Sequence, residues 1–276
     1  MDINTVTSFR RARTRDDLAL APGEAFLGGG TWLMSEPQPG TTGFVDLTTM
    51  GWPDLEITSE GLRIGATCTI ARFVAWAQTE APPHWRATRI IPDAANALLA
   101  SFKIWNTATV GGNICQSFAA GSLTSFTAGL DATAIVWTPD GGERRVAVAE
   151  LVTGNAENAL ARGEVLRAID IPDHALRSHM LLQKIALAEL GRSGAVVTGR
   201  IDPDGASVFG ITAATEAPTV LRFGELPDAE TLAHAVGAAS RYYSDPLGSA
   251  DWRRGVSIVL AERIRTTLLQ AQGQRA

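Results

Sequence analysis

The sequence predicts an α+β protein in three parts: a small α/β lobe over residues 1–60, a larger mixed-sheet lobe over residues 61–173, and a C-terminal antiparallel-sheet-and-helix domain over residues 174–276. Two observations predict this class. In the first two parts, short apolar strands alternate with glycine turns and with runs of helical periodicity. In the last part, strands come first and helices follow, which is the order of an α+β domain.

Length and composition are those of an ordinary globular protein. The chain has 276 residues, 45% hydrophobic and 19% charged, enough for one compact unit or two to three small subdomains with a buried core. The net charge of −5 argues against a nucleic-acid partner, because affinity for a phosphate backbone depends on clustered cations. No apolar run reaches membrane-spanning length, and Met1 does not begin a basic and then apolar signal segment, so a cytoplasmic protein is expected.

Several kinds of chemistry are disfavoured. Cys68 and Cys115 are the only cysteines, so the chain cannot supply four thiolates to an iron–sulfur cluster or a zinc site, and any cluster must belong to another subunit. The histidines show no metal-binding spacing. No Gly-x-Ser-x-Gly elbow, Gly-x-Gly-x-x-Gly motif or Walker loop is present. No catalytic residue and no metal ligand is therefore predicted.

The first part begins with an Arg-rich stretch, residues 9–20, which suits a short amphipathic helix with a solvated face of arginines. Residues 25–27 form a short buried strand that leads into a glycine turn, after which Thr31 is suited to cap a helix. A Pro-rich loop and a strand over residues 44–47 follow.

The second part opens with a hairpin over residues 57–64. Thr69 is a good helix cap, because apolar residues follow it at helical spacing up to Ala77. A second helix is expected from about Asp93, and a third over residues 127–134. Residues 134–148 then form a hairpin around a Pro-Asp-Gly-Gly turn.

The third part starts with a strand over residues 180–188. A hairpin follows, with strands 195–201 and 206–213 joined by an Asp-Pro-Asp-Gly turn. Two helices complete the chain, one with apolar positions from Leu232 to Tyr243 and one with apolar positions from Val256 to Leu268.

Two glycine segments are the strongest candidates for binding a ligand. The first glycine segment, residues 28–32, reads Gly-Gly-Gly-Thr-Trp, and the second glycine segment, residues 109–113, reads Thr-Val-Gly-Gly-Asn. Glycine lets the backbone approach a ligand closely and present its N–H groups, and a phosphate is the usual guest of such a turn. Thr31 and Thr109 offer hydroxyl donors, although capping and strand packing explain threonines there equally well.

The order of motifs resembles the FAD-binding medium subunit of the molybdenum hydroxylases, the flavoproteins of xanthine, carbon monoxide and aldehyde dehydrogenases. The motifs are Gly-Gly-Gly-Thr at 28–31, Val-Asp-Leu at 45–47, Ile-Gly-Ala-Thr at 64–67, Thr-Val-Gly-Gly-Asn-Ile at 109–114, Leu-Asp-Ala at 130–132, Gly-Glu-Val-Leu at 163–166, Ile-Asp-Ile-Pro at 169–172 and Asp-Trp-Arg-Arg at 251–254. The resemblance covers nearly the whole chain. It implies a two-lobed FAD-binding domain followed by the C-terminal domain.

The resemblance also implies where FAD is held. In the family, the two glycine segments wrap the pyrophosphate and the ribityl chain, and an apolar residue and a lysine complete the site. Carried over to this sequence, the cofactor-binding residues are Leu27, Gly28, Gly29, Gly30, Thr31, Trp32, Leu99, Ala108, Thr109, Gly111, Gly112, Asn113, Ser122, Leu166 and Lys184. Lys184 lies in an apolar strand, where a lysine is either an edge-strand solubility device or a cation near the flavin that favours its reduced, anionic form.

Three positions depart from the family pattern. Ser122 stands where the family usually has an aspartate that accepts hydrogen bonds from the cofactor. Trp105 replaces the usual arginine before the second glycine segment, and Trp32 replaces an aspartate that often follows Gly-Gly-Thr, so that its ring stacks on a ligand or simply packs. These departures bear on FAD affinity and on reactivity toward NAD+ or oxygen.

The function implied is that of an electron-transfer oxidoreductase subunit. FAD in this chain would take electrons from [2Fe-2S] clusters of a small partner subunit and pass them to NAD+, oxygen or another acceptor. The molybdenum cofactor would lie in a large partner subunit, in a dimer of heterotrimers, so the substrate cannot be read from this chain. The alternatives are a stand-alone FAD-dependent oxidoreductase of related fold, and a structural subunit that has lost FAD.

Overall fold

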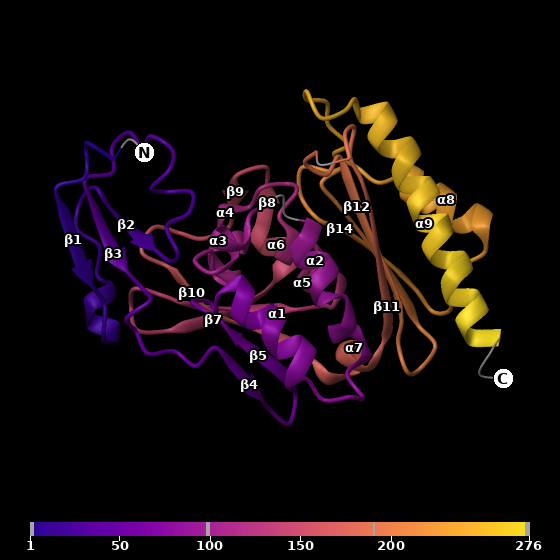
Figure 1. The fold of residues 1–276 in the computed structure, drawn as a ribbon, viewed down its shortest axis with the longest axis horizontal. Helices are drawn as coiled ribbons and strands as arrows, with labels where there is room; N and C mark the ends of the chain where they lie inside the picture. The colour runs from indigo at the N-terminus through magenta and orange to yellow at the C-terminus, as the bar shows by residue number, and fades with distance from the viewer. Residues whose placement is uncertain (1–2, 98–99, 190, 274–276) are drawn as a thin grey trace.

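The structure, a computed structural model, describes residues 3–97, 100–189 and 191–273. Three β-sheets follow one another along the long axis of the molecule, and helices fill the space between the second and third sheets and cover the outer face of the third (Figure 1). The N-terminal sheet lies at one end and the C-terminal helices at the other. The α+β class is confirmed, and the division of the chain into three parts stays a prediction.

The N-terminal sheet has three parallel strands in the order β1-β3-β2. The strands are β1 (Ser8–Arg11), β2 (Glu24–Leu27) and β3 (Gly43–Asp46). The strands predicted at residues 25–27 and 44–47 are thereby confirmed. Phe44 and Val45 are buried and form the centre of this small lobe.

The helix predicted over residues 9–20 is wrong. The stretch forms β1 and a short 3-10 helix, η1 (Arg15–Leu18). Nor do all its arginines form a solvated face, because Arg10 Nε donates to Glu24 Oε1 at 2.9 Å and Arg10 Nη2 donates to Glu24 Oε2 at 2.8 Å. Pairing with β3 and this bidentate ion pair outweigh the weak helical preference of the sequence.

The middle sheet has five antiparallel strands in the order β4-β5-β10-β6-β7. They are β4 (Leu55–Ile57), β5 (Gly61–Gly65), β6 (Thr133–Trp137), β7 (Glu143–Ala147) and β10 (Val165–Pro172), and a small separate pair is formed by β8 (Val152–Gly154) and β9 (Glu157–Asn158). Both predicted hairpins of this part are confirmed. The β4–β5 hairpin spans the predicted limit at residue 60, so the limits of the three parts stay predictions.

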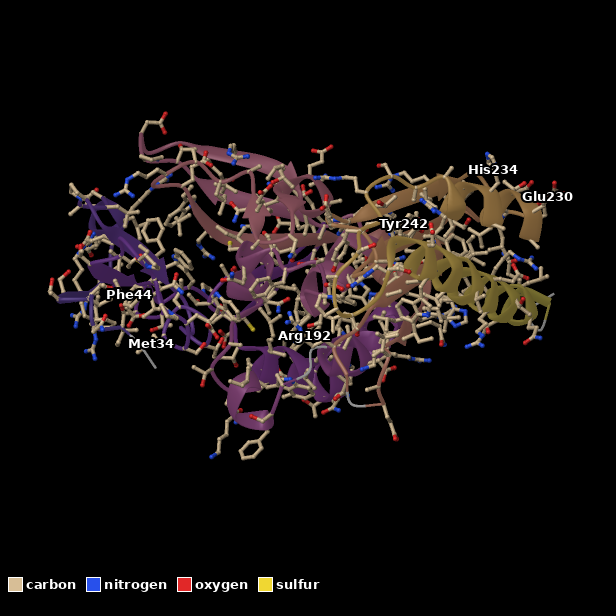
Figure 2. The ribbon with its side chains drawn as sticks, turned by 90° about the horizontal axis from the view of Figure 1, so that it is seen from above. Met34, Phe44, Arg192, Glu230, His234 and Tyr242 are labelled. Atoms are coloured by element: carbon tan, nitrogen blue, oxygen red, sulfur yellow. The ribbon has the colours of Figure 1, made fainter. Side chains whose placement is uncertain are left out.

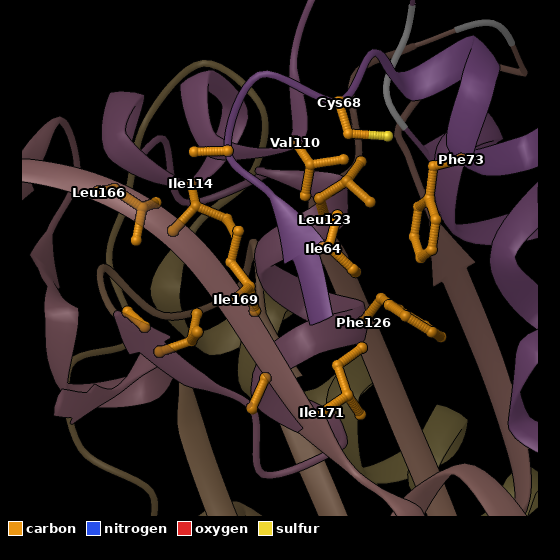
Figure 3. Close-up of a cluster of buried hydrophobic side chains, with 14 of the residues drawn as sticks. Ile64, Cys68, Phe73, Val110, Ile114, Leu123, Phe126, Leu166, Ile169 and Ile171 are labelled. Atoms are coloured by element: carbon orange, nitrogen blue, oxygen red, sulfur yellow. The ribbon is translucent and has the colours of Figure 1, made fainter. Parts of the chain in front are cut away.

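Helices pack on one face of the middle sheet. They are α1 (Ile70–Thr79), η2 (Arg86–Ile90), α2 (Ile91–Ala97), α3 (Phe102–Trp105), α4 (Val110–Gln116), α5 (Ser122–Gly129), α6 (Val148–Leu151) and α7 (Asp173–Arg177). Thr69 caps α1 as predicted, since its side chain accepts a hydrogen bond from Arg72 N. Figure 3 shows the apolar side chains of α4, α5 and β10, including Val110, Phe126 and Ile169, gathered in one buried cluster.

The helix predicted over residues 127–134 lies earlier in the chain, as α5. Its first turn is held by Asn113, whose Oδ1 accepts a hydrogen bond from Leu123 N at 3.0 Å. It ends at Gly129, and Asp131 then takes a positive φ of 55°, which turns the chain into β6. The distant Asn113 contact is invisible to a local reading of the sequence.

The C-terminal domain is a four-stranded antiparallel sheet with two helices on its outer face (Figure 1). It consists of β11 (His179–Ile185), β12 (Ala195–Ile201), β13 (Ser207–Thr212), β14 (Thr219–Phe223), α8 (Ala229–Gly237) and α9 (Ala250–Gly273). The first strand, the hairpin and the last helix are confirmed; the other helix is confirmed only as far as Gly237, so Tyr243 lies beyond it, and β14 was not predicted. Within the described ranges, no helix is both long and apolar enough to cross a bilayer.

Two fully buried arginines fix this domain in place. Arg200 on β12 pairs with Asp131 at 2.6 Å and also donates to the carbonyl of Gly129, so the sheet is tied to the end of α5. Arg253, within the Asp-Trp-Arg-Arg motif, donates to Gly194 O at 2.7 Å and ties α9 to the start of β12. Because a buried guanidinium must be fully paired, Arg200 helps to specify how the domain sits on the middle lobe, and Arg253 holds elements of the domain itself together.

Candidate cofactor site

The two glycine segments, far apart in sequence, touch each other in the fold. A methyl group added at Gly29 would lie 1.8 Å from the carbonyl oxygen of Thr107, and one added at Gly28 would lie 3.0 Å from Thr109 Oγ1. Only a residue without a side chain allows the first of these approaches. The prediction that the segments meet at one site is therefore consistent with the backbone geometry.

The first glycine segment leaves its backbone donors free. Gly30 has a positive φ of 69°, and the chain continues as consecutive turns rather than as the helix predicted after Thr31. The N–H groups of Gly29, Gly30, Thr31 and Trp32 donate to no backbone carbonyl of the described residues. A run of unpaired N–H groups beside a cavity is the arrangement that receives an anionic group.

The second glycine segment is different, because its backbone donors are already used. It forms the first turn of α4, where Val110 N donates to Cys68 O at 2.8 Å and Gly111 N donates to Ala66 O at 2.9 Å. Gly112 N donates to Thr109 Oγ1 at 3.0 Å, and Asn113 N donates to Thr109 O at 2.9 Å. The expectation that these N–H groups face a ligand as free donors is wrong.

Side chains of the second glycine segment supply donors instead. The Thr109 oxygen accepts the capping hydrogen bond, so its own hydroxyl hydrogen stays available. Asn113 Oδ1 is engaged with Leu123 N, and its amide nitrogen donates to none of the described residues. Both residues line the cavity described next. Capping and donation to a ligand are thus compatible for Thr109.

A cavity of about 580 Å³ lies between the lobes and against the C-terminal domain. Its walls include residues of both glycine segments and are otherwise largely apolar. The lining residues are Ala25, Phe26, Gly28, Gly29, Gly30, Thr31, Trp32, Leu33, Leu47, Ala66, Thr67, Ala97, Ala100, Ile104, Ala108, Thr109, Gly111, Gly112, Asn113, Cys115, Gln116, Phe118, Ala120, Gly121, Leu160, Glu164, Val165, Leu166, Arg192 and Ser193. This size and mixture suit an organic cofactor with polar and apolar parts.

Most of the predicted cofactor residues line this one cavity. They are Gly28, Gly29, Gly30, Thr31, Trp32, Ala108, Thr109, Gly111, Gly112, Asn113 and Leu166. Leu27 is buried beneath the first glycine segment at 5% exposure and does not line the cavity. Leu99 lies outside the described residues.

Ser122 and Lys184 are not part of the cavity wall. Ser122 is fully buried at the start of α5, and its hydroxyl has no hydrogen-bond partner among the described residues. Lys184 is exposed on the edge strand β11, where its Nζ donates to Asn96 O at 2.9 Å. The edge-strand interpretation of Lys184 therefore fits its surroundings, and its role toward a cofactor stays a prediction.

Several lining residues were not predicted. Phe118 and Gly121 follow α4, Leu160 and Glu164 precede β10, and Arg192 lies before β12. Figure 2 shows Arg192 near the middle of the molecule, far from Glu230 and His234 on α8. Its guanidinium takes part in none of the ion pairs found among the described residues. Nothing in the local sequence distinguishes Arg192 from the other arginines.

The ionisable groups of the wall are held in fixed states. Hydrogen bonds from Arg144 lower the pKa of Glu164, so this carboxylate stays charged and paired at neutral pH. Burial raises the pKa of the Cys115 thiol to about 12, so it remains neutral, as expected of a small buried apolar residue rather than a nucleophile. Apart from the Arg192 guanidinium and the paired Glu164, the described wall therefore offers neutral donors and apolar surface.

Comparison with known proteins gives a consistent result. Residues 10–174 match the family model described as the FAD binding domain in molybdopterin dehydrogenase. The fold is similar to that of a chain of quinoline 2-oxidoreductase from Pseudomonas putida 86, with a TM-score of 0.79, 22% identity, and coverage of 96% of this chain and 97% of that chain. A chain of carbon monoxide dehydrogenase from Oligotropha carboxidovorans has a TM-score of 0.79 and 21% identity, with coverage of 94% and 97%.

A third structure is of carbon monoxide dehydrogenase from Hydrogenophaga pseudoflava, with a TM-score of 0.76, 18% identity, and coverage of 94% and 96%. A comparison with curated protein sequences gives no significant match. At these identities the structures establish the fold, which extends over almost the whole chain, and the family model carries the assignment of residues 10–174.

Proposed function

Since the chain belongs to the family of FAD-binding domains in molybdopterin dehydrogenases, we propose that it binds one FAD in the 580 Å³ cavity and serves as the electron-transfer subunit of such an enzyme. One observation carries this proposal: the two glycine segments, about 80 residues apart, contact each other and line a single cavity. A purely structural role would not require unpaired N–H groups in the first glycine segment next to a largely apolar cavity of this size.

The chain's own groups would bind and orient the cofactor. The unpaired N–H groups of residues 29–32 would hold the diphosphate, and the Thr109 hydroxyl and the Asn113 amide would add two neutral donors from the opposite wall. Neutral donors suit a net-negative chain, because they bind an anion without a buried counter-charge. The apolar walls exclude water from the rings. Bound FAD supplies reversible electron uptake, which no side chain of the cavity wall provides.

The partners belong to the same proposal. Electrons would arrive from [2Fe-2S] clusters of a small subunit and leave to NAD+, oxygen or another acceptor, while the substrate would react at a molybdenum cofactor in a large subunit. Support for this comes from the family, and from the two cysteines, which are too few to hold a cluster in this chain. Assembly as a dimer of heterotrimers and a cytoplasmic location stay predictions.

An absorption spectrum tests the proposal most directly. The purified chain is expected to show a band near ~450 nm, the region of oxidised flavin, either as isolated or after FAD is added. Gly112→Leu is the matched variant, because Gly112 is exposed on the cavity and a methyl group there would already lie 2.8 Å from Thr109 Oγ1, the oxygen that caps α4. Gly112→Leu should lack the flavin absorption band. Gly224→Leu, at a position with open space around it, should keep it.

Other results would favour a different function. A chain that remains colourless with excess FAD would support the structural subunit without FAD. The buried hydroxyl of Ser122 and indole nitrogen of Trp105, which have no partner in the described part of the chain, motivate this alternative. A chain that binds FAD, purifies alone and turns over a small substrate would support the stand-alone oxidoreductase. Co-purification with a molybdenum-containing and an iron–sulfur subunit would support the proposal.

A further inference from the structure

An aromatic pair forms part of the cavity wall. The rings of Trp32 and Phe118 lie edge to face, with centroids 4.6 Å apart and an interplanar angle of 79°. Of the aromatic pairs among the described residues, this one alone lines the cavity. An edge-to-face pair covers one face of only one of its rings, so the other ring faces can receive a third flat group.

The pair is also unusually open. Trp32 is 39% exposed, whereas Trp52, Trp76 and Trp85, which pack in other aromatic pairs, are at most 9% exposed. A tryptophan held against a phenylalanine, yet left accessible on a cavity, has apolar surface that an occupant of the cavity would cover. Packing in the hydrophobic core therefore does not account for the position of Trp32, which is 39% exposed.

The position of the pair along α4 matters. Gly28 and Gly29 lie beside Thr109 and Thr107, at the start of α4. Phe118 follows Ser117, the cap at the other end of α4, about 10 Å away for a helix of seven residues. The first glycine segment therefore runs alongside α4, and Trp32 directly follows its free N–H groups.

We propose that the Trp32–Phe118 pair stacks against the adenine ring of the dinucleotide. This rests on the proposed function and adds a binding site for one named end of FAD. Because Trp32 is adjacent to the N–H groups of residues 29–31, a ring stacked on it must lie close to the diphosphate. Adenine is joined to the diphosphate by a compact ribose, whereas the flavin ring is joined by a longer, open ribityl chain.

The C-terminal domain adds a cation to the cavity wall. Arg192 and Ser193 line the cavity, and Ser193 Oγ donates to Ala97 O at 3.4 Å, at the end of α2. A guanidinium favours a ring that becomes anionic on reduction, and adenine has no such form. The wall therefore offers an aromatic pair suited to adenine and a cation suited to the flavin ring.

The experiment compares FAD with FMN, which lacks the adenosine part. Flavin is removed from the purified protein, and binding of each cofactor is measured by fluorescence quenching for the natural chain, Trp32→Ala, Trp32→Phe and Phe102→Ala. Phe102, which is 71% exposed and does not line the cavity, is the matched control for loss of an exposed aromatic side chain. FAD affinity should fall about 10- to 100-fold in Trp32→Ala, the scale of base stacking on an aromatic side chain.

FMN affinity should stay within about twofold in the same variant, Trp32→Phe should keep most of the FAD affinity, and Phe102→Ala should change neither. Unchanged FAD affinity in Trp32→Ala would overturn the stacking proposal while leaving the proposed function intact. An equal fall for FMN would overturn the assignment to adenine. A natural chain that binds neither cofactor would overturn the proposed function, and this proposal with it.

Discussion

The two glycine segments have similar sequences, yet they differ in local structure and in how they can meet a ligand. In the first glycine segment the backbone leaves regular structure at Gly30, and the N–H groups of residues 29–32 have no partner among the described residues. In the second, Thr109 caps α4 and every N–H group of residues 110–113 is paired inside the protein. One segment therefore presents backbone donors and the other presents side-chain donors.

The difference teaches that the residues around a glycine pair decide its role. In the second segment a capping threonine stands three residues before Gly112, which is the spacing of a helix start. Its glycines serve close approach, because a methyl group at Gly111 would lie 2.7 Å from the carbonyl oxygen of Ala66. In the first segment the left-handed Gly30 prevents continuation as a helix. The following predictions test this contrast.

The largest effect is expected from Gly29→Ala. The new methyl group would lie 1.8 Å from Thr107 O, which is backbone and cannot rotate away, so the two segments must move apart. We expect flavin content to fall more than tenfold and the free energy of unfolding to fall by about 1–3 kcal/mol, the range for forced overpacking. Flavin absorbance per chain and urea unfolding measure the two effects. Gly224→Ala, with open space around it, should behave as the natural chain does.

Asn113→Asp is expected to separate binding from folding in the second segment. The substituted side chain can still accept the hydrogen bond from Leu123 N, but it loses the amide donor and places a negative charge beside the diphosphate. FAD affinity should fall by about 10- to 100-fold, the equivalent of ~1.5–3 kcal/mol for a hydrogen bond to a charged group, with little change in stability. Titration with FAD and urea unfolding, run in parallel, give both numbers.

Asn113→Ala serves as the contrast, because it also removes the contact to α5. It should lose stability as well as affinity. If Asn113→Asp binds FAD as tightly as the natural chain, the side-chain donors of the second segment do not face the cofactor, and the contrast between the segments is wrong.

Thr109→Val is expected to have a moderate effect on stability. It keeps the shape of the side chain but removes the oxygen that accepts from Gly112 N, and loss of a helix cap costs about 1 kcal/mol. Thr109→Ser restores the oxygen and should recover most of this loss. Thermal unfolding of both variants provides the measurement. Equal stability of all three proteins would mean that the cap does not hold α4.

The sequence predicted much of this fold, and its errors have physical causes. The hairpins around residues 139–142 and 202–205 were correct, because their turn residues specify the connection locally. The helix predicted over residues 9–20 failed, because Glu24 and β3 decide the conformation of β1 from outside the local window. The start of α5 was misplaced for the same reason, since Asn113 fixes it.

The residues of the candidate site also fall into those that local sequence signals predict and those that depend on distant packing. Residues within the two glycine segments were found, because their spacing and composition are local signals. Phe118 and Arg192 were missed, since they reach the cavity only through the packing of α4 and of the C-terminal sheet. Ser122 was placed in the site by position in the chain, yet α5 buries its side chain away from the cavity wall.

The smallest effect on stability is expected when low pH protonates Glu24 on β2, the strand that precedes the first glycine segment. Hydrogen bonds from Arg10 lower the pKa of Glu24 from 4.5 to about 2, so the ionised pair stabilises the folded lobe above the pKa of the unfolded chain. This contribution is fully present above about pH 4.5 and is lost as the pH falls toward about 2. Glu24→Gln should therefore lower the free energy of unfolding by ~1 kcal/mol or less at pH 7.

The difference in free energy of unfolding between the natural chain and Glu24→Gln should become smaller at lower pH, because protonation of Glu24 removes the same interaction. Urea unfolding repeated at several pH values measures this difference. Asp251→Asn is the matched control, because the Asp251 carboxylate pairs with Arg254 although its side chain is 93% exposed. Its free energy of unfolding should equal that of the natural chain within error. Among the described residues no charged pair holds the capped start of α4, so acid should weaken support for the first segment and spare the second. If the difference in free energy of unfolding between the natural chain and Glu24→Gln stays constant from pH 7 to about pH 3, Glu24 acts through its shape rather than its charge.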